Sequence, residues 1–226
     1  MALSGSQDFS LNARQIVRFA LEKINIVAKG EAMEVRKTDA AMRELNTMLK
    51  EFMVVPGLWR TKQGFVNLVN DTAAYSLTPR PYRVIDMRLR QSSGIDLPMT
   101  ELTREEYYDL PLKTSGGIPT QWYFDPQQAS ANIYVWPVLK NVTTQTLRVT
   151  YQRYLDDADD LDDDLDIPPE WLSTLGYNLA ARCADDYGRS GPHIDRIIAR
   201  AGQLYDNMVT FDQPSIIRFV PERRYG

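Results

Sequence analysis

The segment from Asp156 to Asp166 is the clearest cluster of side chains that could take part in chemistry: it contains eight aspartates, interrupted only by Ala158, Leu161 and Leu165. Clustered carboxylates are what calcium sites and two-metal hydrolase sites require. An EF-hand loop, however, needs a glycine at its sixth position and a glutamate at its twelfth, and this run has neither. We expect a hydrated, extended connector, because the like charges repel one another; a metal-dependent hydrolase is the alternative.

Other residues that could act in catalysis are few. His193 is the only histidine, and its position after Gly191-Pro192 favours a capping or surface role. Cys183 lies on an apolar helical stripe, which favours a buried structural thiol. Glu105 and Glu106 fit helix capping better than acid–base catalysis. No phosphate-binding glycine loop, CxxC pair or HExxH motif occurs, so we expect no enzyme, no metal site and no cofactor.

The composition is that of a globular protein able to bury a normal core, with 226 residues of which 43% are hydrophobic. A net charge of −4 with mixed signs offers no broad basic face for tight nucleic-acid binding. The single cysteine fits folding in a reducing compartment. The sequence shows no signal peptide and no membrane-spanning apolar run, so we expect a soluble protein with no membrane partner.

Apolar residues at three- and four-residue spacing predict four long helices, two at each end of the chain. Ser10 is the expected cap of the first helix. The expected ranges are about 11–27, 33–53, 169–187 and 192–208. Each pair is joined by a short connection, so the pairs should form helical hairpins that pack as a four-helix bundle.

The middle of the chain has the composition of antiparallel sheet. A hairpin of residues 121–124 and 132–136 is expected at its centre, inside the stretch Gly117 to Pro137. Further strands are expected at residues 64–70, 73–77, 81–89 and 146–154, the first two flanking a turn at Asn70-Asp71 and the last beside the hairpin. The capping-box pattern Thr103-Arg-Glu-Glu106 predicts a short helix over residues 104–110.

Five aromatic residues in the hairpin could form a stacking platform for sugars or single strands. They are Trp122, Tyr123, Phe124, Tyr134 and Trp136. Because side chains alternate between the faces of a strand, about half should point into a core, and a packed sheet is the favoured interpretation.

The last residues, 209–226, are apolar and basic but have no helical period. Such a terminus is costly to expose, so it should fold back or lie on another subunit. The candidate docking residues are Phe211, Ile216, Ile217, Arg218, Phe219, Val220, Arg223, Arg224 and Tyr225. A complementary acidic patch between subunits would be Asp160, Asp162, Asp163 and Asp164.

These observations predict an α+β protein with four segments. They are an N-terminal helical hairpin (1–55), an antiparallel β domain (56–155), an acidic connector with a C-terminal helical hairpin that packs on the first (156–208), and an extended docking tail (209–226).

Several motifs, in order, resemble the head-to-tail adaptors of short-tailed bacteriophages, a family of packaged-DNA-stabilisation and tail accessory proteins similar in architecture to tail tubular protein A. The likeness covers about residues 12–188. It rests on Ala40 to Lys50, Gly57-Leu-Trp59, Thr72 to Leu77, Thr103 to Tyr107, Gly117-Ile-Pro-Thr120, Tyr123 to Pro126, Ile133 to Pro137, Ile167 to Trp171, Tyr177 to Ala180 and Asp186-Tyr-Gly188.

The resemblance implies a structural virion protein at the capsid–tail vertex, made in the host cytoplasm. It implies a ring of identical subunits, twelve in number, beneath the portal protein and above a further tail or nozzle protein. Such a ring extends the DNA channel and helps retain packaged DNA, without sequence-specific binding. A C-terminal extension reaches the portal in several members, and Phe211 to Gly226 stands at that place. A tail-tube or head-completion component is the alternative within the virion.

Overall fold

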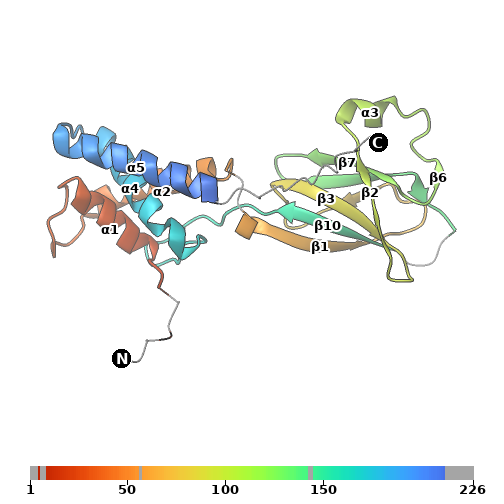
Figure 1. Cartoon of the computed structure of the whole chain (residues 1–226), viewed down its shortest axis with the longest axis horizontal. Helices are drawn as coiled ribbons and strands as arrows, with labels where there is room; N and C mark the ends of the chain where they lie inside the picture. Colours follow the sequence, from red (N-terminus) through yellow and green to blue (C-terminus); the bar gives the residue numbers. More distant parts are fainter. Residues whose placement is uncertain (1–4, 6–8, 56–57, 142–144, 212–226) are drawn as a thin grey trace, which may run out of the picture. The chain divides into compact units, whose positions relative to one another are not determined.

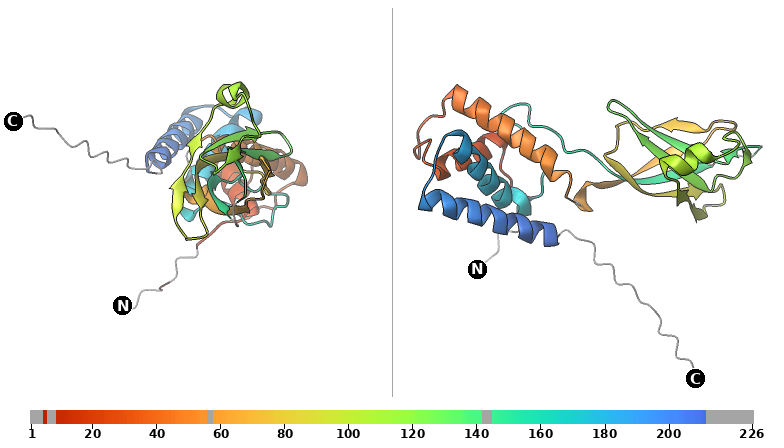
Figure 2. Two further views of the ribbon diagram at one scale, coloured as in Figure 1. Left: turned by 90° about the vertical axis from the view of Figure 1, so that its right-hand side faces the viewer. Right: turned by 90° about the horizontal axis from the view of Figure 1, so that it is seen from above.

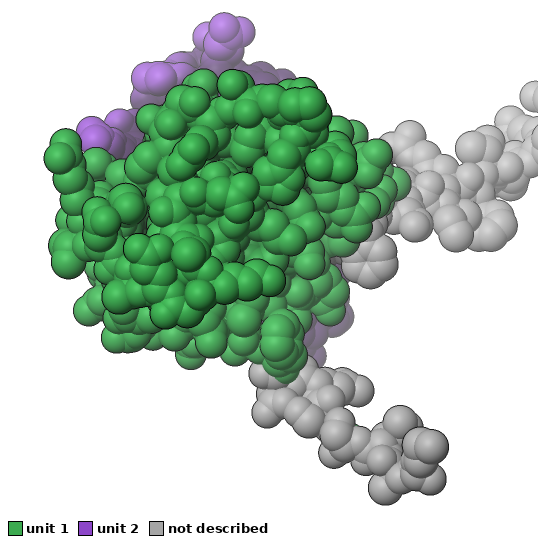
Figure 3. Space-filling view, turned by 90° about the vertical axis from the view of Figure 1, so that its left-hand side faces the viewer, with its two compact units in different colours: residues 1–59, 155–226 green, residues 60–154 purple. Residues whose placement is uncertain are grey.

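The computed structural model describes residue 5 and residues 9–55, 58–141 and 145–211, with the side chain of Phe211 left out. The chain divides into two compact units. One comprises residues 1–59 and 155–226, and the other comprises residues 60–154, coloured separately in Figure 3. The helical unit thus combines both ends of the chain, and the β unit is inserted between them.

In the first unit, helices from both ends of the chain pack together, as the sequence predicts (Figures 1 and 2). The helices are α1 (Ala13–Lys23), α2 (Val35–Phe52), α4 (Leu172–Asp186) and α5 (Pro192–Phe211), and a 3-10 turn, Pro169–Trp171, precedes α4. Helix α4 contacts α1, α2 and α5. Its buried Leu175, Leu179 and Cys183 belong to one core with the apolar stripes of α1 and α2, so amphipathic periodicity explains this unit.

Helix α1 is shorter than expected at both ends. Asn12, not Ser10, caps it: the Asn12 side chain accepts from the Gln15 N–H at 3.0 Å, and the Gln15 side chain accepts from the Asn12 N–H at 3.1 Å. The helix ends at Lys23 because Asn25 adopts a left-handed conformation with φ of 57°. Ile24 and Val27 are still buried in the core, which is why the apolar pattern extended past the helix.

Helix α5 is longer than expected and continues to Phe211. The expectation that the extended tail begins at residue 209 is therefore wrong for residues 209–211. Val209 lies four residues after Tyr205, and both pack against the helical core, so the stripe gains another turn.

The described part of the β unit contains two four-stranded sheets and a two-stranded pair. The first sheet has the order β1-β10-β3-β4 and the second β2-β8-β7-β5. The strands are β1 (Thr61–Asn67), β2 (Ala74–Ser76), β3 (Arg83–Arg90), β4 (Asp96–Pro98), β5 (Thr100–Glu101), β6 (Gly116–Gly117), β7 (Gln121–Pro126), β8 (Ala131–Trp136), β9 (Val138–Leu139) and β10 (Thr146–Gln152). The short helix α3 (Arg104–Asp109) begins with the predicted capping box.

The central hairpin is confirmed, because β7 pairs antiparallel with β8 from Gln121↔Trp136 to Pro126↔Ala131. The turn expected at Asn70-Asp71 is present, and the strands on its two sides pair elsewhere, β1 with β10 and β2 with β8. Two expectations about the sheet were wrong. Strand β10 lies beside β1 and β3 and not beside the hairpin. The pairs β5–β7 and β6–β9 are parallel, so the unit is not purely antiparallel.

The two large sheets share one apolar core. Met87, Leu89, Leu147 and Val149 come from the first sheet, and Trp122, Ile133 and Val135 come from the second. Alternation along β7 sends the neighbouring Tyr123 to the opposite face, where it joins a smaller buried cluster.

That smaller cluster explains the aromatic residues that suggested a platform. Tyr107 of α3 stacks on Tyr123 with ring centroids 5.1 Å apart, and Tyr134 lies 5.9 Å from Tyr123. Burial is the main cause of the raised pKa of Tyr107, with smaller contributions from the neighbouring tyrosines. Four of the five hairpin aromatics therefore build cores on both faces of the sheet, whereas the Trp136 indole N–H donates to the Leu112 carbonyl at 3.0 Å.

Candidate functional site

The acidic segment, residues 156–166, is held against the first turn of α1. The Ala13 N–H donates to the Asp163 carbonyl at 3.0 Å, and the Arg14 N–H donates to the Leu161 carbonyl at 2.7 Å. An isolated antiparallel bridge joins Asn12 to Asp164. The first N–H groups of a helix have no partner within the helix, so the segment supplies carbonyls where α1 needs acceptors.

Side chains reinforce this anchor. The Arg14 guanidinium donates to both carboxylate oxygens of Asp162, at 2.9 and 3.2 Å. This hydrogen bonding, together with the positive charge, lowers the pKa of Asp162. The Asp163 carboxylate accepts from the N–H groups of Asp159 and Asp160, at 2.9 and 2.8 Å, so it closes a turn inside the segment.

Helix α2 holds the beginning of the same segment. The Asn46 side chain donates to the Ala158 carbonyl at 2.8 Å and accepts from the Ala158 N–H at 3.0 Å. Lys50 forms an ion pair with Asp157 and donates to the Leu155 carbonyl at 3.4 Å. Ala158 is buried in the helical core. Specific hydrogen bonds therefore anchor the segment to the helical unit despite the repulsion between carboxylates, while most of its aspartates are exposed to solvent.

The four aspartates of the candidate patch do not share one environment. Asp160, Asp162 and Asp164 are exposed and Asp163 is partly buried. Asp162 and Asp163 have the intramolecular partners given above. Over residues 9–55, 58–141 and 145–211, no group of three or more histidines, cysteines or acids is placed to hold a metal ion.

Most of the candidate docking residues fall outside the described part of the chain: Ile216, Ile217, Arg218, Phe219, Val220, Arg223, Arg224 and Tyr225. Phe211 is the last residue of α5. One turn earlier, Val209 and Tyr205 line an open hollow of about 430 Å³ together with Val54 and Val55. Asp206 and Thr210 also line this hollow, so the end of α5 presents both apolar and polar side chains there.

The other reactive groups have structural roles. His193 Nε2 lies 2.8 Å from the Lys23 carbonyl oxygen, so it connects α5 to the end of α1. Burial is the main cause that raises the pKa of the Cys183 thiol to about 12, which disfavours the nucleophilic thiolate. Glu106 completes the α3 capping box by accepting from the Thr103 N–H at 2.7 Å, and this bond lowers its pKa.

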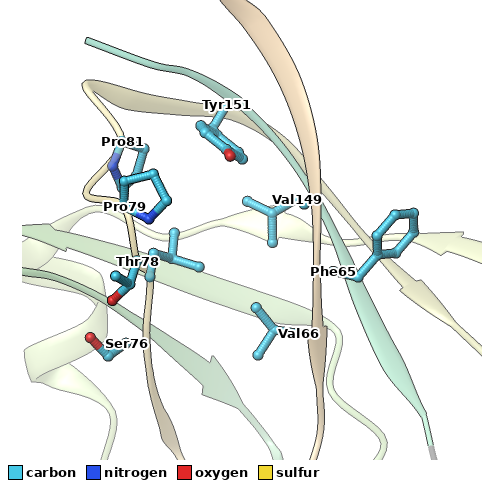
Figure 4. Close-up of a pocket in the computed structure, with 10 residues that line it drawn as sticks. Phe65, Val66, Ser76, Thr78, Pro79, Pro81, Val149 and Tyr151 are labelled. Atoms are coloured by element: carbon cyan, nitrogen blue, oxygen red, sulfur yellow. The ribbon is translucent and has the colours of Figure 1, made fainter. Parts of the chain in front are cut away.

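Sequence reasoning missed a pocket of about 130 Å³ in the β unit. It lies between β1 and the residues that follow β2, and Gly64, Val66, Val149, Tyr151, Leu77 and Pro79 are among those that line it. In Figure 4 the side chains of Val66 and Val149 point toward the hollow, whereas Phe65 points away. The available signal was Gly64, because a glycine inside a strand often marks a place where another chain approaches closely.

None of the helices that the structure describes is long and apolar enough to cross a membrane. Comparison with known proteins gives one family: the model of the SU10 adaptor protein family matches residues 14–215. The match runs through both the helical and the β unit. No curated protein matches the chain.

Proposed function

We propose a function from the premise that the chain belongs to the SU10 adaptor protein family, a family of phage head-to-tail adaptors. Membership implies a structural role in the phage, in contact with portal or tail components, and favours a non-enzymatic protein. The finer proposal is a ring of twelve identical subunits in the virion, docked beneath the portal, that extends the DNA channel toward the next tail or nozzle protein and helps retain packaged DNA. The observation that carries it is a family match that includes nearly all of the described chain.

The helical unit suits such a scaffold. Its four helices share one core, and we interpret them as a four-helix bundle that acts as one rigid body. Three anchors hold the acidic segment to it: Asn46, Lys50 and Arg14. A scaffold of this kind presents a fixed acidic surface to a neighbour, and a net charge of −4 lets DNA pass without tight phosphate contact.

The docking tail is proposed as the segment that joins the assembly. Its apolar residues and the basic Arg218, Arg223 and Arg224 are suited to a partner surface that is apolar at its centre and acidic at its rim. Asp160, Asp162 and Asp164 are exposed on the acidic segment, so they are the members of the acidic patch that we expect a neighbouring subunit to contact. A closed ring needs two different complementary faces on each subunit.

The test is assembly with the portal. Purified portal and full-length chain should form a ring complex visible by electron microscopy, and removal of residues 212–226 should weaken joining by about tenfold or more. The cut follows Phe211, so α5 stays whole. A chain with the same residues 212–226 in scrambled order is the matched control, and it should bind as weakly as the truncated chain. Equal joining by the truncated chain would refute the role of the tail, and no joining by the full chain would refute the adaptor proposal.

A further inference from the structure

Strand β1 is an edge strand whose free side has unused backbone groups. Among the residues that the structure describes, β1 pairs only with β10. The Leu68 N–H donates to the Gln145 carbonyl at 2.9 Å, and the Arg153 N–H donates to the Arg60 carbonyl at 3.1 Å. These two bonds fix the alternation along the antiparallel pair: the even-numbered residues of β1 bond to β10.

The odd-numbered residues of β1 therefore turn their backbone N–H and C=O groups to the free edge. Gln63 and Phe65 lie at the centre of that edge. Among the described residues, no other element provides backbone hydrogen bonds to these two. Such a row of open groups is a template for a further strand.

The pocket lies directly inside this edge. Positions 64 and 66 of β1 lie on the inner face of the sheet, where Gly64 is opposite Val149 and Val66 is opposite Leu147 in the register with β10. Gly64 contributes no side chain, and Tyr151 covers part of its inner face, since a Cβ there would lie 3.1 Å from the Tyr151 ring. A cavity of roughly 150 Å³ can hold a benzene ring, so this pocket of about 130 Å³ is about the size of one aromatic side chain.

The outer face of β1 is different. Phe65 is 61% exposed, and its ring has the Arg148 guanidinium 5.6 Å from its centroid. An added strand would therefore need apolar side chains on the inward face and would meet an aromatic and a charged residue on the outward face.

The chain contains one segment with this pattern outside the described residues. It is Ser215-Ile-Ile-Arg-Phe-Val220, bounded by Pro214 and Pro221. In a strand, Ile217 and Phe219 share one face and Arg218 lies on the other. The β-branched and aromatic residues favour a strand, and a proline ends pairing because it lacks an N–H group.

The geometry points to one occupant: residues 215–220 of a second copy of this chain add antiparallel to the free edge of β1. Phe219 then lies beside Gly64 and fills the pocket, and Ile217 lies beside Val66. In this register Arg218 exchanges backbone hydrogen bonds with Phe65, and the nitrogen of Pro221 faces away from β1, where no donor is needed. The antiparallel direction is chosen because antiparallel pairs bond more favourably.

The second copy is chosen because the tail and the β1 edge are different surfaces of the same chain. A contact between them is heterologous and repeats from subunit to subunit, which is what a ring requires. The inference thus rests on the proposed function for its setting and names the contact that would join neighbours.

The first test uses a labelled peptide of residues 212–226 and the full chain with I217N and F219N, whose own tail is disabled. Fluorescence anisotropy should give a dissociation constant on the order of 10 µM. The same peptide with I217N and F219N should bind at least tenfold more weakly, and the control peptide with I216N and V220N should bind within about threefold of the original. Equal loss in the two variant peptides, or no saturable binding of the original, would refute the inference.

A change in β1 tests the edge itself. Phe65→Pro removes an N–H that points to the free edge and leaves the bonds to β10 in place, while Phe65→Ala removes the same ring and keeps the N–H. Peptide binding should be lost with F65P and kept with F65A, with circular dichroism confirming that both chains are folded. Equal binding by the two chains, both folded, would refute strand addition.

Disulfide trapping identifies which copy supplies the strand. Mixed chains carrying F65C or R218C should form a heterodimer under mild oxidation, because paired Cα atoms in such a ladder lie about 5.5 Å apart, within disulfide reach. The matched control I85C is also exposed but lies on β3, away from the free edge, and should not cross-link with R218C. The buried Cys183 should add little background.

A bond that forms only within a chain carrying both cysteines would refute the second-copy assignment, as would equal cross-linking of I85C. These experiments contain no portal. If these experiments give the expected results but the chain does not join the portal, the proposed adaptor role is refuted and the tail–β1 contact stands. If the chain joins the portal but these experiments fail, the tail–β1 contact is refuted and the adaptor role stands.

Discussion

Replacing Gly176 with alanine should destabilise the helical unit, although alanine is the better helix former. Gly176 is buried in α4, and a Cβ there would lie 2.5 and 2.6 Å from two ring carbons of Phe19 in α1. The ring is not free to leave, since it packs edge-on against Tyr177 with centroids 5.5 Å apart and has Lys23 Nζ 5.1 Å above it. Gly176 is therefore the residue that lets α1 and α4 approach.

Two effects compete in Gly176→Ala. Removing a glycine from a helix interior gains about 1 kcal/mol. Forcing a methyl group into a filled site costs about 1–3 kcal/mol, and we take about 2 kcal/mol because both contacts are far shorter than a Cβ tolerates. The net loss should be about 1 kcal/mol, equivalent to a urea midpoint lower by about 0.5 M for a slope near 2 kcal/mol/M.

The effect of Gly176→Ala on the free energy of unfolding should change sign when the Phe19 ring is removed. In a Phe19→Ala background the clash is gone, so Gly176→Ala should stabilise by about 1 kcal/mol, which gives a coupling energy of about 2 kcal/mol. Gly202→Ala in α5 is the control, because a Cβ there meets nothing within 4 Å, and it should stabilise in either background. Far-ultraviolet circular dichroism in urea reports mainly on this unit, which holds the four long helices. If G176A behaves like G202A in the parent chain, the steric argument fails.

Three further outcomes are expected. Asn46→Ala removes both hydrogen bonds to the buried Ala158 and should cost about 2 kcal/mol in urea unfolding, and N46D should cost at least as much, because its carboxylate would face the Ala158 carbonyl oxygen within an acidic segment. Because the pKa of Asp162 is lowered in the folded chain, its contribution to folding stability is present above pH 3.8 and is lost as the pH falls further. Below pH 3.8 the thermal midpoint should therefore decrease less steeply with falling pH in D162N or R14Q than in the parent chain. Equal pH profiles would contradict this. Cys183, with a pKa of about 12, should react with a thiol reagent about a thousandfold more slowly in the folded chain than in denaturant, and similar rates would contradict its burial.

Helix signals in the sequence were reliable because they are local. The apolar spacing of Leu45, Met48 and Leu49 predicts the buried face of α2, and all three are buried. Thr103 and Glu106 make the predicted capping box. The hairpin of β7 and β8 was also predicted, since its two strands are joined by a short loop.

Pairing between distant strands could not be predicted in the same way. Strand β1 pairs with β10, which lies near the other end of the β unit in sequence. The alternation of residues in either strand does not indicate which other strand it pairs with. The acidic segment also shows this limit: its charges alone predict repulsion, but Asn46, Lys50 and Arg14 come from helices far away in the sequence and give its backbone and carboxylates their partners.

The sequence by itself determined the helical stripes, the hairpin, the lack of catalytic motifs and the likeness to phage adaptors, because each depends on neighbouring residues or on their order. Only the tertiary structure decided that β1 is an edge strand, that Gly64 and Val66 line a pocket behind it, and that the aspartate run is fixed to α1 and α2. Those features arise from contacts between segments distant in the chain, and a one-dimensional pattern carries no record of which segments meet.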